Sequence, residues 1–212
     1  SVKEWGLEKF MNKVVFGPLK KIGKKMNFIS MKFLFFGLIP LYIFSLILFY
    51  WNSVLPKEIL SALPYVYSGF AFLLVLKSFT ERKNPILAWT LVFFNHFWIA
   101  LAVSFNEHFD WTHTLLYLSG TSVAAIIGLD CLFVLKKKEP TYFSLHHYFG
   151  HVYEHKKLGT VFLLSAMGLM GFPITTSFIG EDLIYSHIHA DQFGLAIFYA
   201  LSYIMGGISL VR

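Results

Sequence analysis

Residues 86–105 read ILAWTLVFFNHFWIALAVSF and contain no Asp, Glu, Lys or Arg, with His96 as their one ionisable side chain. A helix rises 1.5 Å per residue, so roughly 20 mainly apolar residues cross the hydrocarbon core of a bilayer. This stretch therefore predicts a transmembrane helix. Similar apolar runs occupy 33–51, 60–77, 113–135, 160–180 and 193–211. We predict an all-α, polytopic transmembrane helix bundle with about six spans.

The composition agrees with a chain that folds in lipid. Hydrophobic residues make up 56% of the 212 residues and charged residues only 14%, whereas soluble domains carry about 25% charged residues. The net charge of +6 lies in short blocks between the apolar runs. The sequence therefore predicts the lipid bilayer, with its anionic headgroups, as the partner of these charges and no nucleic acid. We also expect no bound cofactor.

The loop charges alternate along the chain. Residues 1–32 hold eight Lys, and the loops at 78–85 and 136–159 also carry Lys or Arg. The loops at 106–112 and 181–192 carry neither. Basic residues gather on the cytoplasmic side of membrane proteins. The pattern predicts a multi-pass protein of the cell inner (plasma) membrane, with both termini cytoplasmic.

Residues 1–32 differ from the rest of the chain. Apolar and Lys positions alternate at helical spacing over 4–25, with an interruption expected at Gly17-Pro18. This pattern is typical of an amphipathic helix in the membrane interface, and a helix docked on the cytoplasmic side is the alternative. We therefore divide the chain into an interfacial segment, 1–32, and a transmembrane bundle, 33–212.

Ionisable residues inside spanning segments are costly and therefore indicate function. His96, His113, Glu181 and Asp182 are the candidates for a proton path, and a hydrogen-bonded structural role is the alternative for each histidine. Pro173 predicts a break in the fifth span, because proline removes a backbone hydrogen bond. We expect Gly171, Pro173, Thr175 and Thr176 to form the break. Glu181 is expected to begin or end the second half-helix as the outer exchange site, with His96 and His113 further inside.

Residues 171–184, GFPITTSFIGEDLI, resemble the G-x-P-x-x-x-x-F-x-G-E/K segment of antiporter-like proton-conducting membrane subunits. This family is shared by respiratory complex I, Mrp-type cation/proton antiporters and membrane-bound hydrogenases. The resemblance implies a discontinuous helix whose acidic or Lys residue ends a proton path. Glu181 occupies that position.

Two further segments are similar to the same family, and together the match covers about residues 60–212. Residues 83–90, KNPILAWT, resemble K-x-x-L-A-Y-S-T. Residues 113–123, HTLLYLSGTSV, resemble K-A-L-L-F-L-G-A-G-S-V, with His113 in place of the central lysine. The family's first discontinuous helix has no counterpart in this sequence. The resemblance implies a subunit of a larger complex, with other membrane subunits as partners and protons, or Na⁺, as the ion that is moved.

Four histidines gather in the loop at 136–159. His147, His151 and His155 follow at i, i+4 and i+8, which would place them on one face of a helix, where they could hold a metal. A solvated His-rich loop is the interpretation we favour, without a metal. The alternatives to a proton-conducting subunit are therefore a membrane metalloenzyme built on this His cluster and a structural subunit that anchors partners. The sequence leaves open whether the complex is an NADH:quinone oxidoreductase-like enzyme or an antiporter.

Overall fold

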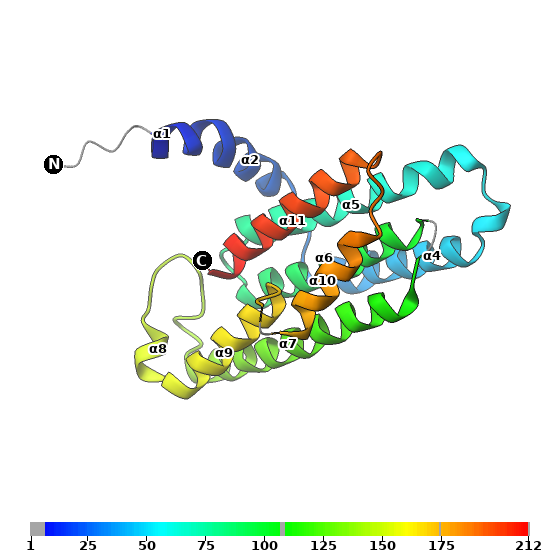
Figure 1. Ribbon diagram of the computed structural model, residues 1–212. Coiled ribbons are helices and arrows are strands. Elements are labelled where there is room, and N and C mark those ends of the chain that lie inside the picture. The colour runs from blue at the N-terminus through cyan, green and yellow to red at the C-terminus, as the bar shows by residue number, and fades with distance from the viewer. Residues whose placement is uncertain (1–6, 107–108, 174, 212) are drawn as a thin grey trace.

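The computed structural model describes residues 7–106, 109–173 and 175–211, and it is helical wherever it is regular (Figure 1). The predicted all-α class is confirmed for these residues. The elements in chain order are α1 (Leu7–Met11), η1 (Asn12–Phe16), α2 (Gly17–Lys25), α3 (Met31–Phe33), η2 (Leu34–Leu38), α4 (Ile39–Tyr50), η3 (Asn52–Val54), α5 (Lys57–Thr80), α6 (Pro85–Ser104), α7 (Trp111–Lys138), α8 (His151–Glu154), α9 (Lys156–Leu169), α10 (Thr176–Ser186) and α11 (Phe193–Val211).

In the described part of the chain, five helices are long enough and apolar enough to cross a membrane. Each overlaps one of the predicted spans: Met31–Tyr50, Lys57–Thr80, Pro85–Ser104, Trp111–Lys138 and Phe193–Val211. The predicted span at 160–180 corresponds instead to two shorter helices, because α9 stops at Leu169 and α10 begins at Thr176.

The long helices begin at side chains that cap their free amide groups. The Asn84 side chain accepts a hydrogen bond from the Leu87 amide, and Pro85 follows at the first helical position, where it has no partner to lose. Asp110 accepts from the Thr112 amide at 2.8 Å and starts α7 in the same way. Both caps interrupt the apolar pattern and set the ends of neighbouring spans.

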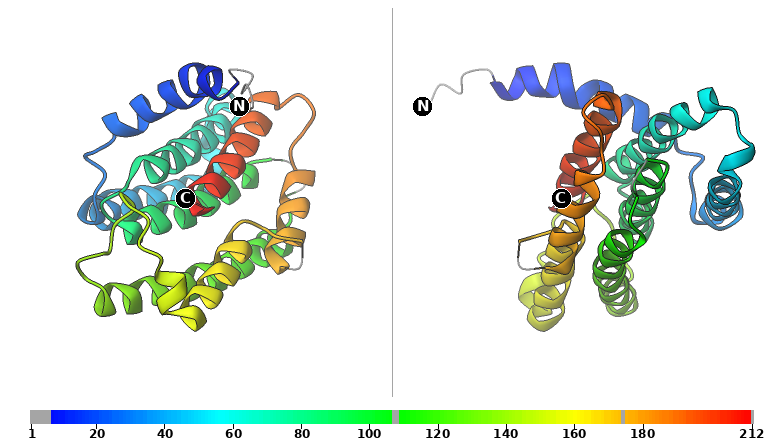
Figure 2. Two further views of the ribbon diagram at one scale, coloured as in Figure 1. Left: turned by 90° about the vertical axis from the view of Figure 1, so that its left-hand side faces the viewer. Right: turned by 45° about the vertical axis from the view of Figure 1, so that its right-hand side comes forward.

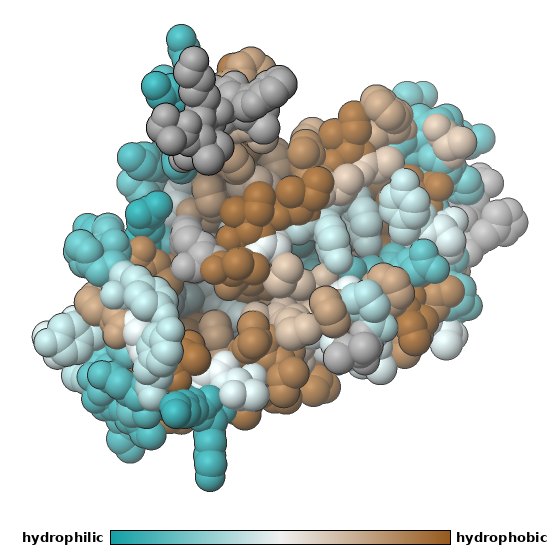
Figure 3. Space-filling model, turned by 60° about the vertical axis from the view of Figure 1, so that its left-hand side comes forward, coloured by the Kyte–Doolittle hydropathy of each residue, from teal (hydrophilic) through white to brown (hydrophobic). Residues whose placement is uncertain are grey.

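Helix α6 forms the centre of the bundle. It packs between α5 and α7, and α11 covers α5. Of the most apolar stretch of α6, 83% is buried, against 17% for Met31–Tyr50. Large exposed hydrophobic side chains on the outer helices include Phe36 and Ile126. Figure 3 shows hydrophobic residues across the middle of one face and hydrophilic residues towards its two ends. Such a surface suits lipid or another membrane subunit.

The N-terminal helices lie to one side of the bundle (Figure 2). Residues 7–25 are helical throughout, so the interruption predicted at Gly17-Pro18 is absent. Instead, the π-helical turn η1 ends two residues before Pro18, and η2 ends two residues before Pro40. A wider turn separates a proline ring from the carbonyl four residues earlier, so the helix continues past each proline. Residues 1–6 of the predicted interfacial segment lie outside the described residues.

Candidate functional site at a broken helix

The interruption between α9 and α10 has a defined backbone structure. Gly171 adopts a φ of +63°, a backbone conformation that residues with a Cβ atom rarely adopt. The Phe172 amide donates to the Met167 carbonyl at 3.0 Å, and the Gly171 amide donates to the Gly168 carbonyl at 3.3 Å. This pair of bonds is the Schellman pattern, which ends a helix at a left-handed glycine. Pro173 follows directly and cannot continue the helix.

Hydroxyl groups donate hydrogen bonds to backbone carbonyls at the interruption. Ser177 donates to the Gly168 carbonyl in a short hydrogen bond, and Thr175 donates to the Phe172 carbonyl at 2.6 Å. The Thr175 and Ser177 hydroxyl groups also lie 2.8 Å apart. A groove of about 480 Å³ borders the interruption between α7 and α9, with Ser119, Ser165 and Thr176 in its lining. Polar groups therefore surround this exposed backbone, as lipid-embedded backbone requires.

Both halves of the broken helix pack along α7 through small residues. A Cβ on Gly168 would lie 2.9 Å from Ala124 Cβ, and one on Gly120 would lie 2.7 Å from the Ser177 amide nitrogen. A Cβ on Gly180 would lie only 2.4 Å from Tyr117 Cα. These close approaches are the common way in which helices associate in membranes. They place the interruption beside the first half of α7.

Glu181 is buried at this site and Asp182 is exposed. The Glu181 carboxylate lies against the backbone of Gly171, because a Cβ on that glycine would overlap it. Tyr199 donates from its hydroxyl group to the Glu181 carbonyl at 3.4 Å. Within the described residues, no lysine, arginine or histidine pairs with the Glu181 carboxylate. Glu181 is the sixth residue of α10, so the expectation that it begins or ends that half-helix is wrong.

His96 meets Tyr117 at the same depth. The His96 Nδ1 atom and the Tyr117 hydroxyl oxygen lie 2.7 Å apart, and both side chains are buried. The other ring nitrogen, Nε2, lies near the Leu169 carbonyl at the end of α9 without forming a hydrogen bond of ordinary geometry. Tyr117 also lies within electrostatic reach of Glu181. The structure thus brings two of the predicted residues, His96 and Glu181, around one tyrosine that the sequence prediction did not include.

His113 is the third residue of α7, near the start of that helix, rather than inside the bundle. Its Nδ1 atom is 2.9 Å from Nε2 of His187, and its Nε2 atom is 3.7 Å from the Asp110 carboxylate. Tyr117 follows one turn later on the same face of α7. His113 therefore lies nearer the start of α7, and Glu181 lies beside residues one turn further along it. This is the reverse of the prediction, which placed Glu181 outermost and His113 further inside. The structure does not bring His113 into contact with His96.

His187 and Asp110 lie outside the spanning helices, in the connections beside the His113 end of α7. Burial lowers the pKa of His187, and the charge of His113 lowers it further, while Asp110 raises it. The hydrogen bond from the Thr112 amide holds the pKa of Asp110 below its ordinary value. In the hydrogen bond between the two histidines, one of the facing nitrogens carries the hydrogen and the other accepts it.

Several buried polar atoms near the central helix have no protein partner. Those in α6, α7 and α11 are Asn95 Oδ1, His96 Nε2, Trp98 Nε1, Thr114 Oγ1, Ser202 Oγ and Ser209 Oγ. Buried polar atoms are normally hydrogen-bonded to protein or to ordered water. Ordered water is the usual partner of such atoms.

The four loop histidines do not share a helical face. His147 is exposed in an irregular segment, His151 begins the four-residue helix α8, and His155 lies between α8 and α9. The proposed i, i+4, i+8 arrangement of His147, His151 and His155 is therefore wrong. All four loop histidines instead line a cavity of about 450 Å³, together with Trp89 and Tyr142. Among the described residues, one group could hold a metal, and it combines His155 with two glutamates.

A buried ion pair lies on the side of the loop histidines, and the sequence prediction missed it. Lys77 Nζ is 2.6 Å from Glu81 Oε2 and 3.4 Å from the Asn27 side-chain oxygen. Burial raises the pKa of Glu81, but Lys77 and the amide groups of Lys83 and Asn84 outweigh it and hold the pKa below its ordinary value. The i, i+4 spacing of the two residues was the available signal.

No family model matches the chain, and no curated protein or solved structure shows a significant similarity to it. The chemistry of the site therefore has to be judged from its own residues. A buried carboxylate lies at a gap in a helix, within electrostatic reach of a tyrosine hydroxyl that is hydrogen-bonded to an imidazole. Each of the three groups can accept and release a proton.

Proposed function

We propose that this chain is an antiporter-like membrane subunit that conducts protons through Glu181, Tyr117 and His96. The observation that carries the proposal is the buried Glu181 carboxylate beside the helix interruption, next to the Tyr117–His96 hydrogen bond of 2.7 Å. Intramembrane ionisable groups that face the bundle interior are typical of proton relays. The resemblance of residues 171–184 to the antiporter-like subunits supports the same function.

The transfer between the groups follows from their hydrogen-bonding abilities. The Tyr117 hydroxyl donates to His96 Nδ1 in one tautomer of the ring and accepts from it in the other. A proton received on the tyrosine oxygen from Glu181, directly or through water, can therefore leave towards His96 without forming a free tyrosinate. The Leu169 backbone lies beside the His96 ring at the end of α9 and is proposed to hold the ring in position for this transfer.

His113, His187 and Asp110 form the outer end of the proposed path. His113 and Tyr117 lie one turn apart on α7, so one or two water molecules can link the two levels. Asp182, on the exposed face of α10, is proposed to contact a partner subunit or the entry side rather than to carry the proton itself. In this proposal the moved ion is the proton, with Na⁺ as the second candidate.

The proposed setting is a cell inner membrane with both termini on the cytoplasmic side. One end of the molecule contains the C-terminal end of α7, the start of α9, the end of α11 and the N-terminal helices (Figure 1). That end carries the lysines of residues 9–32 and 136–157. The N-terminal segment is proposed to rest on anionic headgroups. Single cysteines placed in 140–150 of a Cys131→Ala protein should react from the cytoplasmic side, and reaction from outside would reverse the orientation.

The function is tested by proton flux through the protein and its partners in sealed vesicles. Glu181→Gln keeps the size and hydrogen bonding of the side chain but removes its titration. It should lower flux at least tenfold, a modest value for loss of a positioned proton-transfer group. Asp182→Asn is the matched control, because the neighbouring carboxylate is exposed, and it should keep most of the flux. Full flux in Glu181→Gln with normal assembly would favour a structural anchor subunit.

A further inference from the structure

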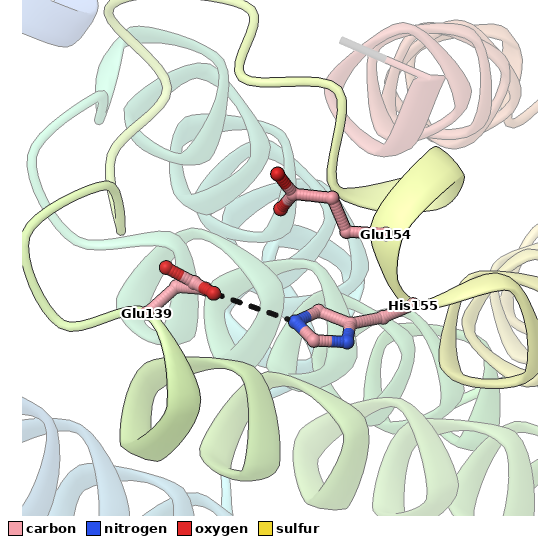
Figure 4. A group of neighbouring side chains, drawn as sticks. All are labelled: Glu139, Glu154 and His155. Carbon is pink, nitrogen blue, oxygen red and sulfur yellow. Dashed lines mark ion pairs between the residues drawn. The ribbon is translucent and has the colours of Figure 1, made fainter.

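Three potential metal ligands converge where the connection between α7 and α9 closes (Figure 4). Glu139 directly follows the last residue of α7, Glu154 ends α8, and His155 precedes α9. One donor atom from each lies within 4.8 Å of the other two. His155 Nε2 lies 3.6 Å from Glu139 Oε1. Ligands of a tetrahedral Zn²⁺ about 2.1 Å from the ion are about 3.4 Å apart, so small side-chain rotations complete such a site.

The charges around the group favour a cation between the two carboxylates. Five lysines flank it in sequence, at 136–138 and 156–157. Within the described residues, none of these lysines lies within 4.0 Å of Glu139 or Glu154. Two like charges at this separation repel each other unless a cation or proton is shared. Among the described residues, the groups within 4.0 Å of these carboxylates that could carry positive charge are two imidazoles, His155 beside Glu139 and His151 beside Glu154.

The histidine nitrogens give a second, independent observation. His155 Nε2 is buried and has no hydrogen-bond partner. His151 Nε2 lies 3.2 Å from the Tyr142 carbonyl, so it carries the proton that this bond needs. In the neutral ring, Nδ1 is then a bare lone pair, and it lies 3.9 Å from the Glu154 carboxylate. A lone pair that faces a carboxylate suits a metal ion, and a carbonyl that fixes the far nitrogen is the usual support of a metal-bound histidine.

We propose that Glu139, Glu154 and His155 bind one divalent transition-metal ion of the Zn²⁺ class, and that a rotation of His151, whose Nδ1 atom lies 3.9 Å from the Glu154 carboxylate, brings it in as the fourth ligand. His151 and His155, on either side of Glu154 in the sequence, supply two imidazoles, and Glu139 and Glu154 supply two carboxylates. Zn²⁺ accepts this ligand set. The ion joins the end of α7 to the start of α9 and thereby holds the intervening loop over the 450 Å³ cavity. The site is structural, and it does not depend on the proposed proton path.

Metal retention by the untagged full chain in detergent is the test, because a histidine tag would itself bind the probe. After incubation with Zn²⁺ and dialysis, elemental analysis should find one equivalent on the unmodified protein. Glu139→Gln and His155→Gln should each weaken Zn²⁺ binding at least tenfold, in line with loss of a ligand. His147→Gln is the matched control, since His147 is an exposed histidine of the same loop, and it should keep one equivalent.

Co²⁺ provides a readout that a folding defect cannot imitate. Its visible absorption should report a tetrahedral site in the unmodified protein and in His147→Gln, and should be lost in Glu139→Gln. Helix content and elution volume of each variant show whether it remains folded, and Glu154→Gln replaces any variant that does not. The proposal is overturned if the unmodified protein retains no more Zn²⁺ than the ligand variants. Since no proton flux is measured, this result is separate from the outcome for Glu181.

Discussion

Replacing Gly180 by alanine should separate α10 from α7 and pull Glu181 away from Tyr117. The added Cβ would lie 2.4 Å from Tyr117 Cα and 2.7 Å from its amide nitrogen. Carbon atoms in contact normally lie 3.5–4.0 Å apart, so α10 has to retreat by about 1 Å. The obstacle is main chain of a packed helix, which cannot rotate aside as a side chain can.

The size of the effect follows from two opposed terms. Alanine favours the helix over glycine by about 1 kcal/mol. Overpacking of a close contact costs about 1–3 kcal/mol, and backbone obstacles belong at the upper end of this range. We expect a net loss of about 1–2 kcal/mol in the free energy of unfolding, which is about a 5–30-fold change in the ratio of folded to unfolded protein. Proton flux should fall as well, because the contact positions Glu181.

Thermal unfolding in detergent, followed by proton flux in vesicles, measures both effects. Gly206→Ala is the control, because its Cβ would meet only Val92 Cγ1, at an ordinary 3.8 Å. That variant gains helix propensity alone and should unfold at the same or a higher temperature with normal flux. Equal unfolding temperatures and equal flux in Gly180→Ala and Gly206→Ala would refute the close packing of α10 on α7.

Three further predictions concern the hydrogen bonds and charges around the site. Tyr117→Phe leaves His96 Nδ1 without its hydrogen-bond partner, so it should cost about 1–3 kcal/mol of stability and lower proton flux at least tenfold. Tyr203→Phe, at an exposed tyrosine, is the control measured alongside. His113→Ala removes a neighbouring charge that lowers the pKa of His187, so nuclear magnetic resonance titration should find that pKa raised towards its ordinary value; an unchanged or lower value would contradict the contact. Lys77→Met breaks the ion pair with Glu81, whose pKa is lowered in the folded state. The loss of stability in the variant should therefore be greatest above about pH 4.3, the pKa of an unfolded glutamate, and should vanish as the pH falls through the folded-state pKa of Glu81. A stability difference that grows with acid would show that the sign is wrong.

The spans were predictable because each is a long, mainly apolar run with few charged residues. Residues 86–105 in the prediction became Pro85–Ser104 in the structure, since Asn84 and Pro85 mark the start chemically. The π-turns before Pro18 and Pro40 were not predictable, because proline is tolerated either by an interruption or by a widened turn. The choice depends on packing that a single sequence does not record.

The site was predictable only in part. Pro173 and Gly171 indicate an interruption by local chemistry, but the burial of Glu181 and the exposure of Asp182 depend on how α10 rotates against α7. Tyr117 carries no charge and looks like any aromatic residue of a span, so its role emerges only from the contact with His96. Glu139 and His155 are 16 residues apart, and only the folded loop brings them together.

The central claim is that Glu181 gains and loses a proton inside the membrane. Infrared difference spectra of protein in sealed vesicles, recorded as the imposed pH gradient is reversed, observe this directly through the C=O stretching band of a protonated carboxyl group. The account predicts a band that appears and disappears with the gradient, shifts in D₂O, persists in Asp182→Asn and is absent in Glu181→Gln. An identical band in Glu181→Gln, or no carboxyl band in the unmodified protein, would contradict it.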